Sequence, residues 1–172
     1  MNVRAIFLIF FLCFGGFNLT AQLYESVVGV RIGAPLSFSY KKIIQENKAI
    51  EGILGTRGND VYRFVNVSGA YQIIQPLDFA TVEELYFYYG AGASIYFWSF
   101  KEEGNNQSVT PGIQGYLGLE YTFPDRPINL TLGWTPSIFI SGHLAGLRGG
   151  YLGVGIRYVL SRATEDEGNL DP

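Results

Sequence analysis

Several residue types are scarce in this sequence, and each scarcity excludes a class of protein. The only cysteine, Cys13, lies in an N-terminal segment that we expect to be removed, so the mature chain should have no thiol, disulfide or cysteine metal site. Charged residues make up only 16% of the chain, against about a quarter in typical soluble domains. No basic patch of the kind that binds nucleic acid is present. The only histidine is His143, which restricts imidazole chemistry to one position.

Aromatic residues and glycine are abundant instead. Phe, Trp and Tyr make up 16% of the chain, and there are 22 glycines. Few charges together with many aromatics and glycines are typical of a β-protein that contacts a membrane and unfavourable for a soluble one.

Residues 1–21 have the features of a secretory signal peptide. Arg4 supplies positive charge, an apolar stretch follows, and Ala21 is a small residue at the expected cleavage position. The apolar stretch is too short for a spanning helix. We therefore predict a signal peptide at 1–21, one barrel domain at 22–161 and a disordered acidic periplasmic tail at 162–172.

The rest of the chain alternates between apolar and small or polar residues with a period of two, which predicts β-strands with two different faces. Near the C-terminus, Leu152, Val154 and Ile156 alternate with Gly153 and Gly155. Eight such segments are expected, at residues 25–33, 36–44, 49–56, 62–74, 85–98, 110–123, 128–141 and 150–161. Pro136 interrupts the seventh segment and predicts a local bulge in the ladder.

The two faces of the last four segments show which side would meet lipid. Their apolar faces carry no charge, whereas the opposite faces hold mainly Gly, Ser, Thr, Asn and Tyr. Lys or Arg facing lipid at mid-membrane costs about 2–4 kcal/mol, and a soluble barrel would need a charged outer face. The pattern therefore predicts an all-β, eight-stranded antiparallel transmembrane β-barrel with a filled interior, rather than a soluble lipocalin-like barrel.

The chain also resembles a known family. Segments such as AIEGIL (49–54), YYGAGA (88–93), GLEYTFPDRPINL (118–130) and GVGIRY (153–158) are similar to those of small eight-stranded outer-membrane barrels of the OmpA/OmpX type, in the style of Bacteroidetes proteins. The resemblance implies a bacterial outer membrane, with lipid, lipopolysaccharide and the barrel assembly machinery as partners. With eight strands and a tight link at 124–127, we expect both termini to lie in the periplasm.

Five charged residues fall on the faces expected to line the barrel interior. They are Arg31, Lys41, Glu51, Glu120 and Arg157. Eight strands enclose a space that side chains just fill, and an unpaired buried charge is costly. We expect a structural network of salt bridges; a narrow ion path or proton relay is the alternative.

A hydrolytic site is the second alternative. His143 and Ser141 lie in the last outer loop, and lipid A deacylases, which are also eight-stranded barrels, use a Ser/His/acid arrangement. Here no carboxylate alternates with the serines on this strand pair, and Leu144 follows the histidine where the family has its serine nearby. We therefore expect no enzyme activity, cofactor or metal, and a structural or surface-interaction protein whose partner is unidentified. A lipid-modifying hydrolase or a narrow porin-like channel are the alternatives.

Overall fold

The computed structural model describes residues 24–77, 84–100, 107–141 and 146–162, with the side chains of 107 and 147–149 not described. These residues form eight strands. They are β1 (Ser26–Gly33), β2 (Leu36–Gln45), β3 (Lys48–Gly58), β4 (Tyr62–Pro76), β5 (Leu85–Phe100), β6 (Gln107–Thr122), β7 (Ile128–Phe139) and β8 (Gly146–Ser161). The expected signal peptide and nearly all of the expected acidic tail lie outside the described residues.

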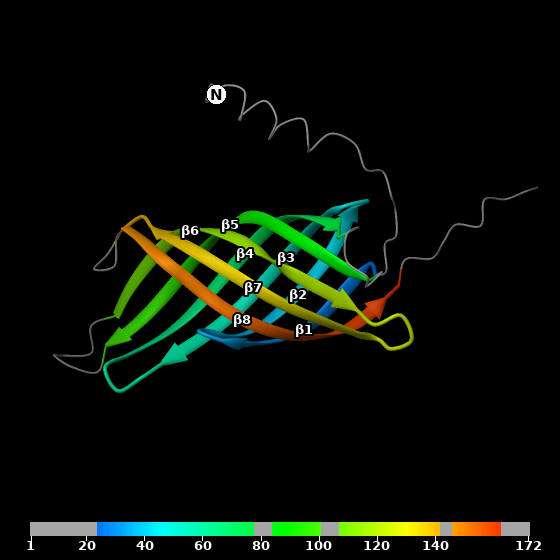
Figure 1. Cartoon of the computed structure of the whole chain (residues 1–172). Helices are drawn as coiled ribbons and strands as arrows, with labels where there is room; N and C mark the ends of the chain where they lie inside the picture. The colour runs from blue at the N-terminus through cyan, green and yellow to red at the C-terminus, as the bar shows by residue number, and fades with distance from the viewer. Residues whose placement is uncertain (1–23, 78–83, 101–106, 142–145, 163–172) are drawn as a thin grey trace, which may run out of the picture.

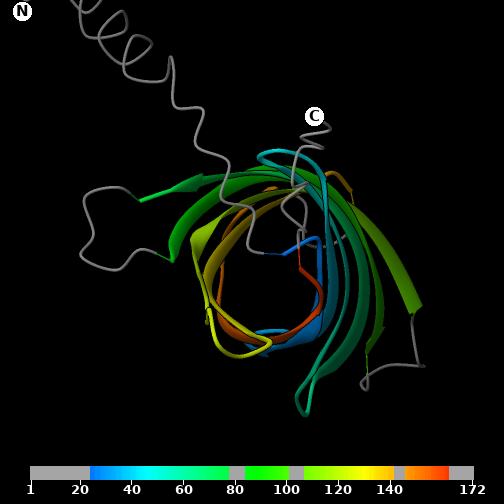
Figure 2. The ribbon, with the colours of Figure 1, turned by 90° about the vertical axis from the view of Figure 1, so that its right-hand side faces the viewer.

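Each strand pairs antiparallel with its neighbour in the sequence, and β1 pairs with β8 to close the barrel. Figure 1 shows the strands strongly tilted along the barrel, and Figure 2 shows the closed ring from one end. The prediction of an all-β, eight-stranded antiparallel barrel is confirmed. Within the described part of the chain, no helix has the length and apolar character needed to span a membrane.

The strand positions agree with the prediction except at several ends. The strand β6 begins at Gln107 rather than 110, because pairing with β5 continues to Ser99. The strand β8 begins at Gly146 rather than 150, and β7 ends at Phe139 rather than 141. The early starts of β6 and β8 come from backbone pairing across a hairpin, which does not require apolar alternation in the paired residues.

The expected irregularity at Pro136 is present. The register between β7 and β8 shifts between Thr135 and Ser137. Opposite the shift, Gly150 adopts a left-handed backbone with φ of 84°, and a Cβ at this position would lie 2.6 Å from Pro136 Cα. Glycine is therefore required here both by the backbone conformation and by the close approach.

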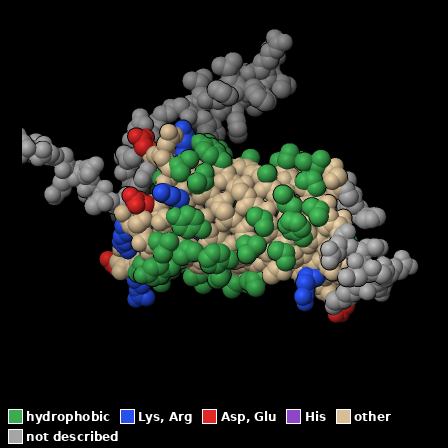
Figure 3. Space-filling model, turned by 180° about the vertical axis from the view of Figure 1, so that it is seen from behind, with side chains coloured by type: hydrophobic (Ala, Val, Ile, Leu, Met, Phe, Trp, Pro, Cys, Tyr) green, Lys and Arg blue, Asp and Glu red, His purple; other side chains and the backbone are tan. Residues whose placement is uncertain are grey.

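The outer face of the barrel is apolar along most of its length. Leu132, Val154 and Ile156 are each at least half exposed, and Figure 3 shows apolar side chains across the middle of one face with charged ones near its two ends. The exposed charged residues Lys42, Arg57 and Arg63 lie near strand ends. The alternation of the sequence thus turns its large apolar residues outward.

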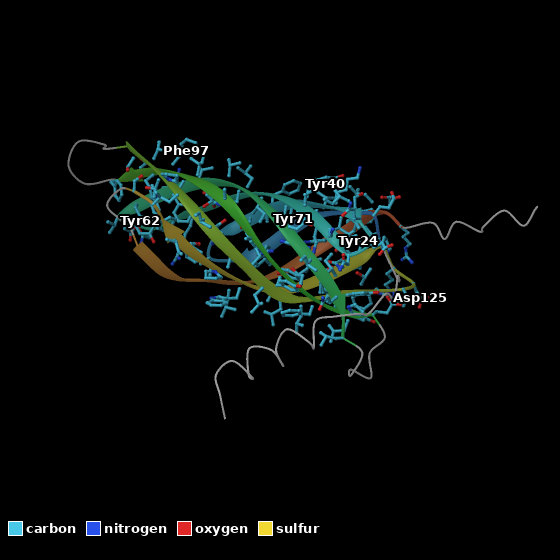
Figure 4. The ribbon with its side chains drawn as sticks, turned by 90° about the horizontal axis from the view of Figure 1, so that it is seen from above. Tyr24, Tyr40, Tyr62, Tyr71, Phe97 and Asp125 are labelled. Atoms are coloured by element: carbon cyan, nitrogen blue, oxygen red, sulfur yellow. The ribbon has the colours of Figure 1, made fainter. Side chains whose placement is uncertain are left out.

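The interior is filled along its axis. We call the rim that carries Tyr24 and the turn containing Asp125 the terminal rim, and the opposite rim, near Tyr62, the loop rim (Figure 4). Towards the terminal rim the interior holds charged groups together with apolar and tyrosine side chains such as Ala49, Ile74 and Tyr86, and towards the loop rim it holds aromatic rings. The short turn between β1 and β2, at Ala34 and Pro35, stops well before the hairpin between β3 and β4 (Figure 1).

Candidate functional site

The five charged residues that the sequence places on the inner face all lie inside the barrel and form one ionic network. Lys41, Glu51, Glu120 and Arg157 are each at most 2% exposed, and Arg31 is 8% exposed. They come from β1, β2, β3, β6 and β8. We call these five residues the charge network.

One end of the charge network is centred on Glu120. Its Oε2 accepts a hydrogen bond of 2.7 Å from Lys41 Nζ, and its Oε1 accepts one of 2.6 Å from the Tyr24 hydroxyl. Lys41 Nζ also lies 4.7 Å from the centre of the Tyr88 ring. Burial and the adjacent Glu120 carboxylate raise the pKa of the Tyr24 hydroxyl, so this group remains a neutral donor.

The other end is centred on Glu51. Its Oε1 accepts a hydrogen bond of 2.6 Å from Arg157 Nη2, and its Oε2 accepts one of 2.6 Å from Gln72 Nε2. Arg157 Nη1 lies 3.6 Å from Glu120 Oε2. Arg157 therefore bridges the two carboxylates and joins both ends of the charge network. Such charge-assisted bonds offset the cost of burying the ions only when their geometry is good.

Tyr88 packs inside the barrel beside Lys41, where two glycines make room for it. The ring is 1% exposed. A Cβ at Gly133 would lie 2.2 Å from the Tyr88 hydroxyl oxygen, and one at Gly118 would lie 2.6 Å from it. These two glycines face each other across β6 and β7. The hydroxyl of Tyr88 thus occupies space that any larger residue at Gly133 would take.

Nearer the loop rim, aromatic side chains fill the interior. Phe64, Tyr96, Trp98 and Phe139 form one buried group, which we call the aromatic cluster. The ring centres of Phe64 and Trp98 are 4.7 Å apart, and those of Tyr96 and Phe139 are 5.0 Å apart in an edge-to-face arrangement. These distances lie in the range of favourable aromatic pairs.

Sequence reasoning missed two members of the site. Gln72 is fully buried and shares its inward face with Phe64, Asn66 and Ser68, so its burial follows from the alternation of β4. Its contact with Glu51 depends on the register between β3 and β4, for which the sequence carries no signal. Tyr24 precedes β1, so no strand pattern indicates where its side chain lies.

Of the two residues of the alternative hydrolytic site, Ser141 and His143, the structure describes only Ser141. Ser141 is exposed, and His143 lies outside the described residues. Ser137, another serine of the same strand pair, is buried and accepts a hydrogen bond from Gln114 Nε2. The described residues include no group of three or more His, Cys, Asp and Glu placed to hold a metal ion.

Comparison with known proteins shows similarity at the level of the fold. The structure is similar to Neisserial surface protein A, with a TM-score of 0.54 and 14% sequence identity over 78% of this chain and 92% of that one. It is also similar to the N-terminal β-barrel domain of Pseudomonas aeruginosa OprF, with a TM-score of 0.55 and 16% identity over 80% of this chain and 100% of that one. No protein-family model matches the sequence, and no curated protein is significantly similar to it. The chain therefore has the closed eight-stranded fold of outer-membrane barrels.

Proposed function

We propose that this chain is a non-enzymatic barrel of a bacterial outer membrane with a structural or surface-interaction role. The observation that carries the proposal is the reversal of the usual protein pattern. Leu132, Val154 and Ile156 are exposed on the outer face, whereas Glu51, Glu120 and Arg157 are buried inside. An apolar outer band around a polar interior is the arrangement that a lipid bilayer stabilises.

The positions of the rims support an orientation. With eight strands, both ends of the barrel chain lie at the terminal rim, which we assign to the periplasm. Tyr40 and Tyr158 are exposed on the outer face, and both pair with Val28 near the start of β1, on the side of this rim. Aromatic residues at such positions anchor a barrel at the membrane interface. The loop rim then faces outward and is the surface offered to lipopolysaccharide or to an unidentified protein partner.

Arginine substitutions at two depths on the outer face test whether the barrel lies in a membrane. Leu132 lies near the middle of β7 and is 52% exposed, and Ile140 follows the last residue of that strand. In lipid vesicles, Leu132→Arg should lower the free energy of unfolding by about 2–4 kcal/mol, and Ile140→Arg by about 0–1 kcal/mol. Equal and small losses would mean that the outer face contacts water, and the proposal would be wrong.

Cell fractionation, conductance measurements and lipid analysis distinguish the proposed non-enzymatic role from the porin-like channel and the lipid-modifying hydrolase. The mature protein should sediment with outer membranes and change its gel mobility on boiling. Purified protein should form no steady channels in planar bilayers, because side chains fill an eight-stranded lumen. Cells that carry His143→Ala should show the same lipid A masses as the wild type. Steady channels would favour the porin-like alternative, and loss of an acyl chain only in the presence of His143 would favour the hydrolase.

A further inference from the structure

The barrel wall is incomplete on one side of the loop rim, above the short β1–β2 turn. The last pair between β1 and β8 is Gly33–Gly153, and the last pair between β2 and β3 is Leu36–Thr56. Beyond these pairs β8 continues along β7 and β3 continues along β4, so each is paired on one side only among the described residues. Figure 1 shows the β1–β2 turn ending before the β3–β4 hairpin. The edges of β3 and β8 therefore border a gap in the wall.

A cleft lies at this gap, and we call it the side cleft. Its walls include Arg31 of β1, the turn residues Ala34 and Pro35, and Tyr151, Leu152 and Gly153 of β8. Leu152 is exposed on the outer face, and the two turn residues are only half-buried. The side cleft therefore reaches the outer surface where β1 and β2 end.

Arg57 is exposed although it belongs to the inward face of β3. In the alternation of this strand it shares that face with Glu51 and Ile53, which are buried. It is exposed because the pairing of β3 with β2 ends at Thr56. Arg57 Cζ lies 5.9 Å from the centre of the Tyr151 ring, within the range of a cation–π contact. Because Tyr151 is a wall of the side cleft, Arg57 reaches across the gap to its mouth.

The apolar outer face continues past the level of the side cleft. Thr135 of β7 lines the cleft. Three and five residues further towards the loop rim, Ile138 and Ile140 are 50% and 62% exposed on the outer face. A strand tilted by about 40° advances roughly 2.5 Å per residue along the barrel axis, so the apolar face continues about 8–12 Å beyond the cleft. The side cleft thus lies at a depth where hydrocarbon surrounds the rest of the barrel.

The charges around the side cleft are positive in sum. The end of the β3–β4 hairpin carries Arg57 and Arg63 against one carboxylate, Asp60, and Arg57 forms no ion pair with a described carboxylate. Inside the barrel the charge network holds three cations against two carboxylates. Arg31 Nε and Nη2 are buried, so Arg31 acts on a group in the cleft through its field and not by contact. A cation that faces hydrocarbon is costly unless an anion binds it, and lipid phosphate is the anion available at this depth.

Large apolar side chains lie on the opposite side of the cleft mouth, towards mid-membrane. Ile32, Leu36 and Leu152 are 64%, 53% and 68% exposed on the outer face around the β1–β2 turn. Positive charge thus lies towards the loop rim, and apolar surface lies towards the middle of the barrel. This is the order of head group and acyl chains in the outer leaflet of a membrane.

We propose that the mouth of the side cleft binds the phosphate of one outer-leaflet lipid, whose acyl chains lie over Ile32, Leu36 and Leu152. The Arg57 guanidinium donates forked, charge-assisted hydrogen bonds to the phosphate oxygens. The excess positive charge at Arg31 adds to the attraction, and the lipid covers the gap left by the short β1–β2 hairpin. This inference rests on the membrane location proposed above.

Native mass spectrometry of the mature barrel, released from a nonionic detergent, tests the site with two lipids that differ only in the phosphate. The wild type should bind one dimyristoyl phosphatidic acid about tenfold more tightly than dimyristoylglycerol, because charge-assisted hydrogen bonds contribute at least about a factor of ten. Arg57→Met should remove this preference. Arg63→Met should keep it, since Arg63 pairs with Gly58 on the same hairpin but lies on the outward face. Equal binding of both lipids by the wild type, or a preference that persists in Arg57→Met, would overturn the proposal.

A competitor without chains tests whether the ligand is a lipid. Glycerol 3-phosphate carries the same phosphate and should not displace phosphatidic acid at equal concentration, whereas displacement would show that the site takes phosphate alone and would overturn the lipid assignment. The change of gel mobility on boiling shows that each variant is folded. Leu132→Arg tests the membrane location separately, so a failed lipid preference with the expected Leu132→Arg result would overturn the site and leave the membrane location standing.

Discussion

The two halves of the barrel interior are filled by different chemistry, although the same strands build both. The strand β4 contributes Gln72 to the surroundings of the charge network and Phe64 to the aromatic cluster. Towards the terminal rim, stability depends on matched charges in addition to the apolar cluster that includes Ala49, Ile74 and Tyr86, because each ion is tolerated only with its partners. Towards the loop rim it depends on buried area and ring packing, which need no particular partner. The comparison teaches that one end of a filled lumen can require particular ionic partners, while the other end requires only well-packed aromatic side chains.

The largest effect is expected from breaking the charged half. Glu120→Ala removes the acceptor of Lys41 and Tyr24 and leaves Arg157 with one carboxylate. Removing one partner of a buried ion pair costs about 3–5 kcal/mol. The control Asp125→Ala changes an exposed turn residue and should cost less than about 0.5 kcal/mol. The free energy of unfolding in urea measures the loss for Glu120→Ala and for Asp125→Ala. Glu167→Ala, which lies outside the described residues, is a second control.

A second substitution sharpens this result. Lys41→Met combined with Glu120→Ala restores the wild-type net charge of the network, so the double variant should be more stable than Glu120→Ala alone. If the double variant were no more stable than the single one, Glu120 would act through packing rather than through its charge.

A smaller loss of stability is expected from a substitution in the aromatic cluster. Phe64→Ala empties the centre of the aromatic cluster, where Phe64 is 1% exposed, and should cost about 3 kcal/mol. Phe64 lies eight residues from Gln72 on β4, or about 26 Å along the strand. The losses from Phe64→Ala and Glu120→Ala should therefore add within about 0.5 kcal/mol. A larger coupling in a double-mutant cycle would show that the two halves are one unit.

The smallest loss of stability is expected at Gly133, which packs against the Tyr88 hydroxyl beside the charge network. Gly133→Ala would place a methyl group against the Tyr88 hydroxyl, and overpacking of this kind costs about 1–3 kcal/mol. Tyr88→Phe removes that oxygen, and the next atom of the ring lies 3.5 Å from the position that the methyl group would take. The double variant should recover most of the loss in urea unfolding. Failure to recover would mean that the backbone of β7, not the tyrosine, rejects the methyl group.

The positions and faces of the strands could be read from the sequence because they depend on local order. Successive side chains of a strand point to opposite faces, so Glu51 and Arg157 must share the side opposite to their apolar neighbours. The same rule identifies Phe64 and Trp98 as inward residues once their strands are recognised. The ends of β6 and β8 were harder to place, because pairing there continues through residues without alternation.

The partners inside the barrel were decided by tertiary structure alone. Arg157 and Glu51 are 106 residues apart and belong to β8 and β3, which are not neighbours in the sheet. They meet because closure through β1 and β8 and the stagger of the strands bring distant positions to one level of the lumen. The sequence by itself determined that five charges would enter the interior. Only closure decided that four of them would be hydrogen-bonded while Arg31 Nη2 would lie 3.8 Å from the Glu51 carboxylate, beyond hydrogen-bonding distance. The physical reason is that register is a property of paired strands and not of any one segment.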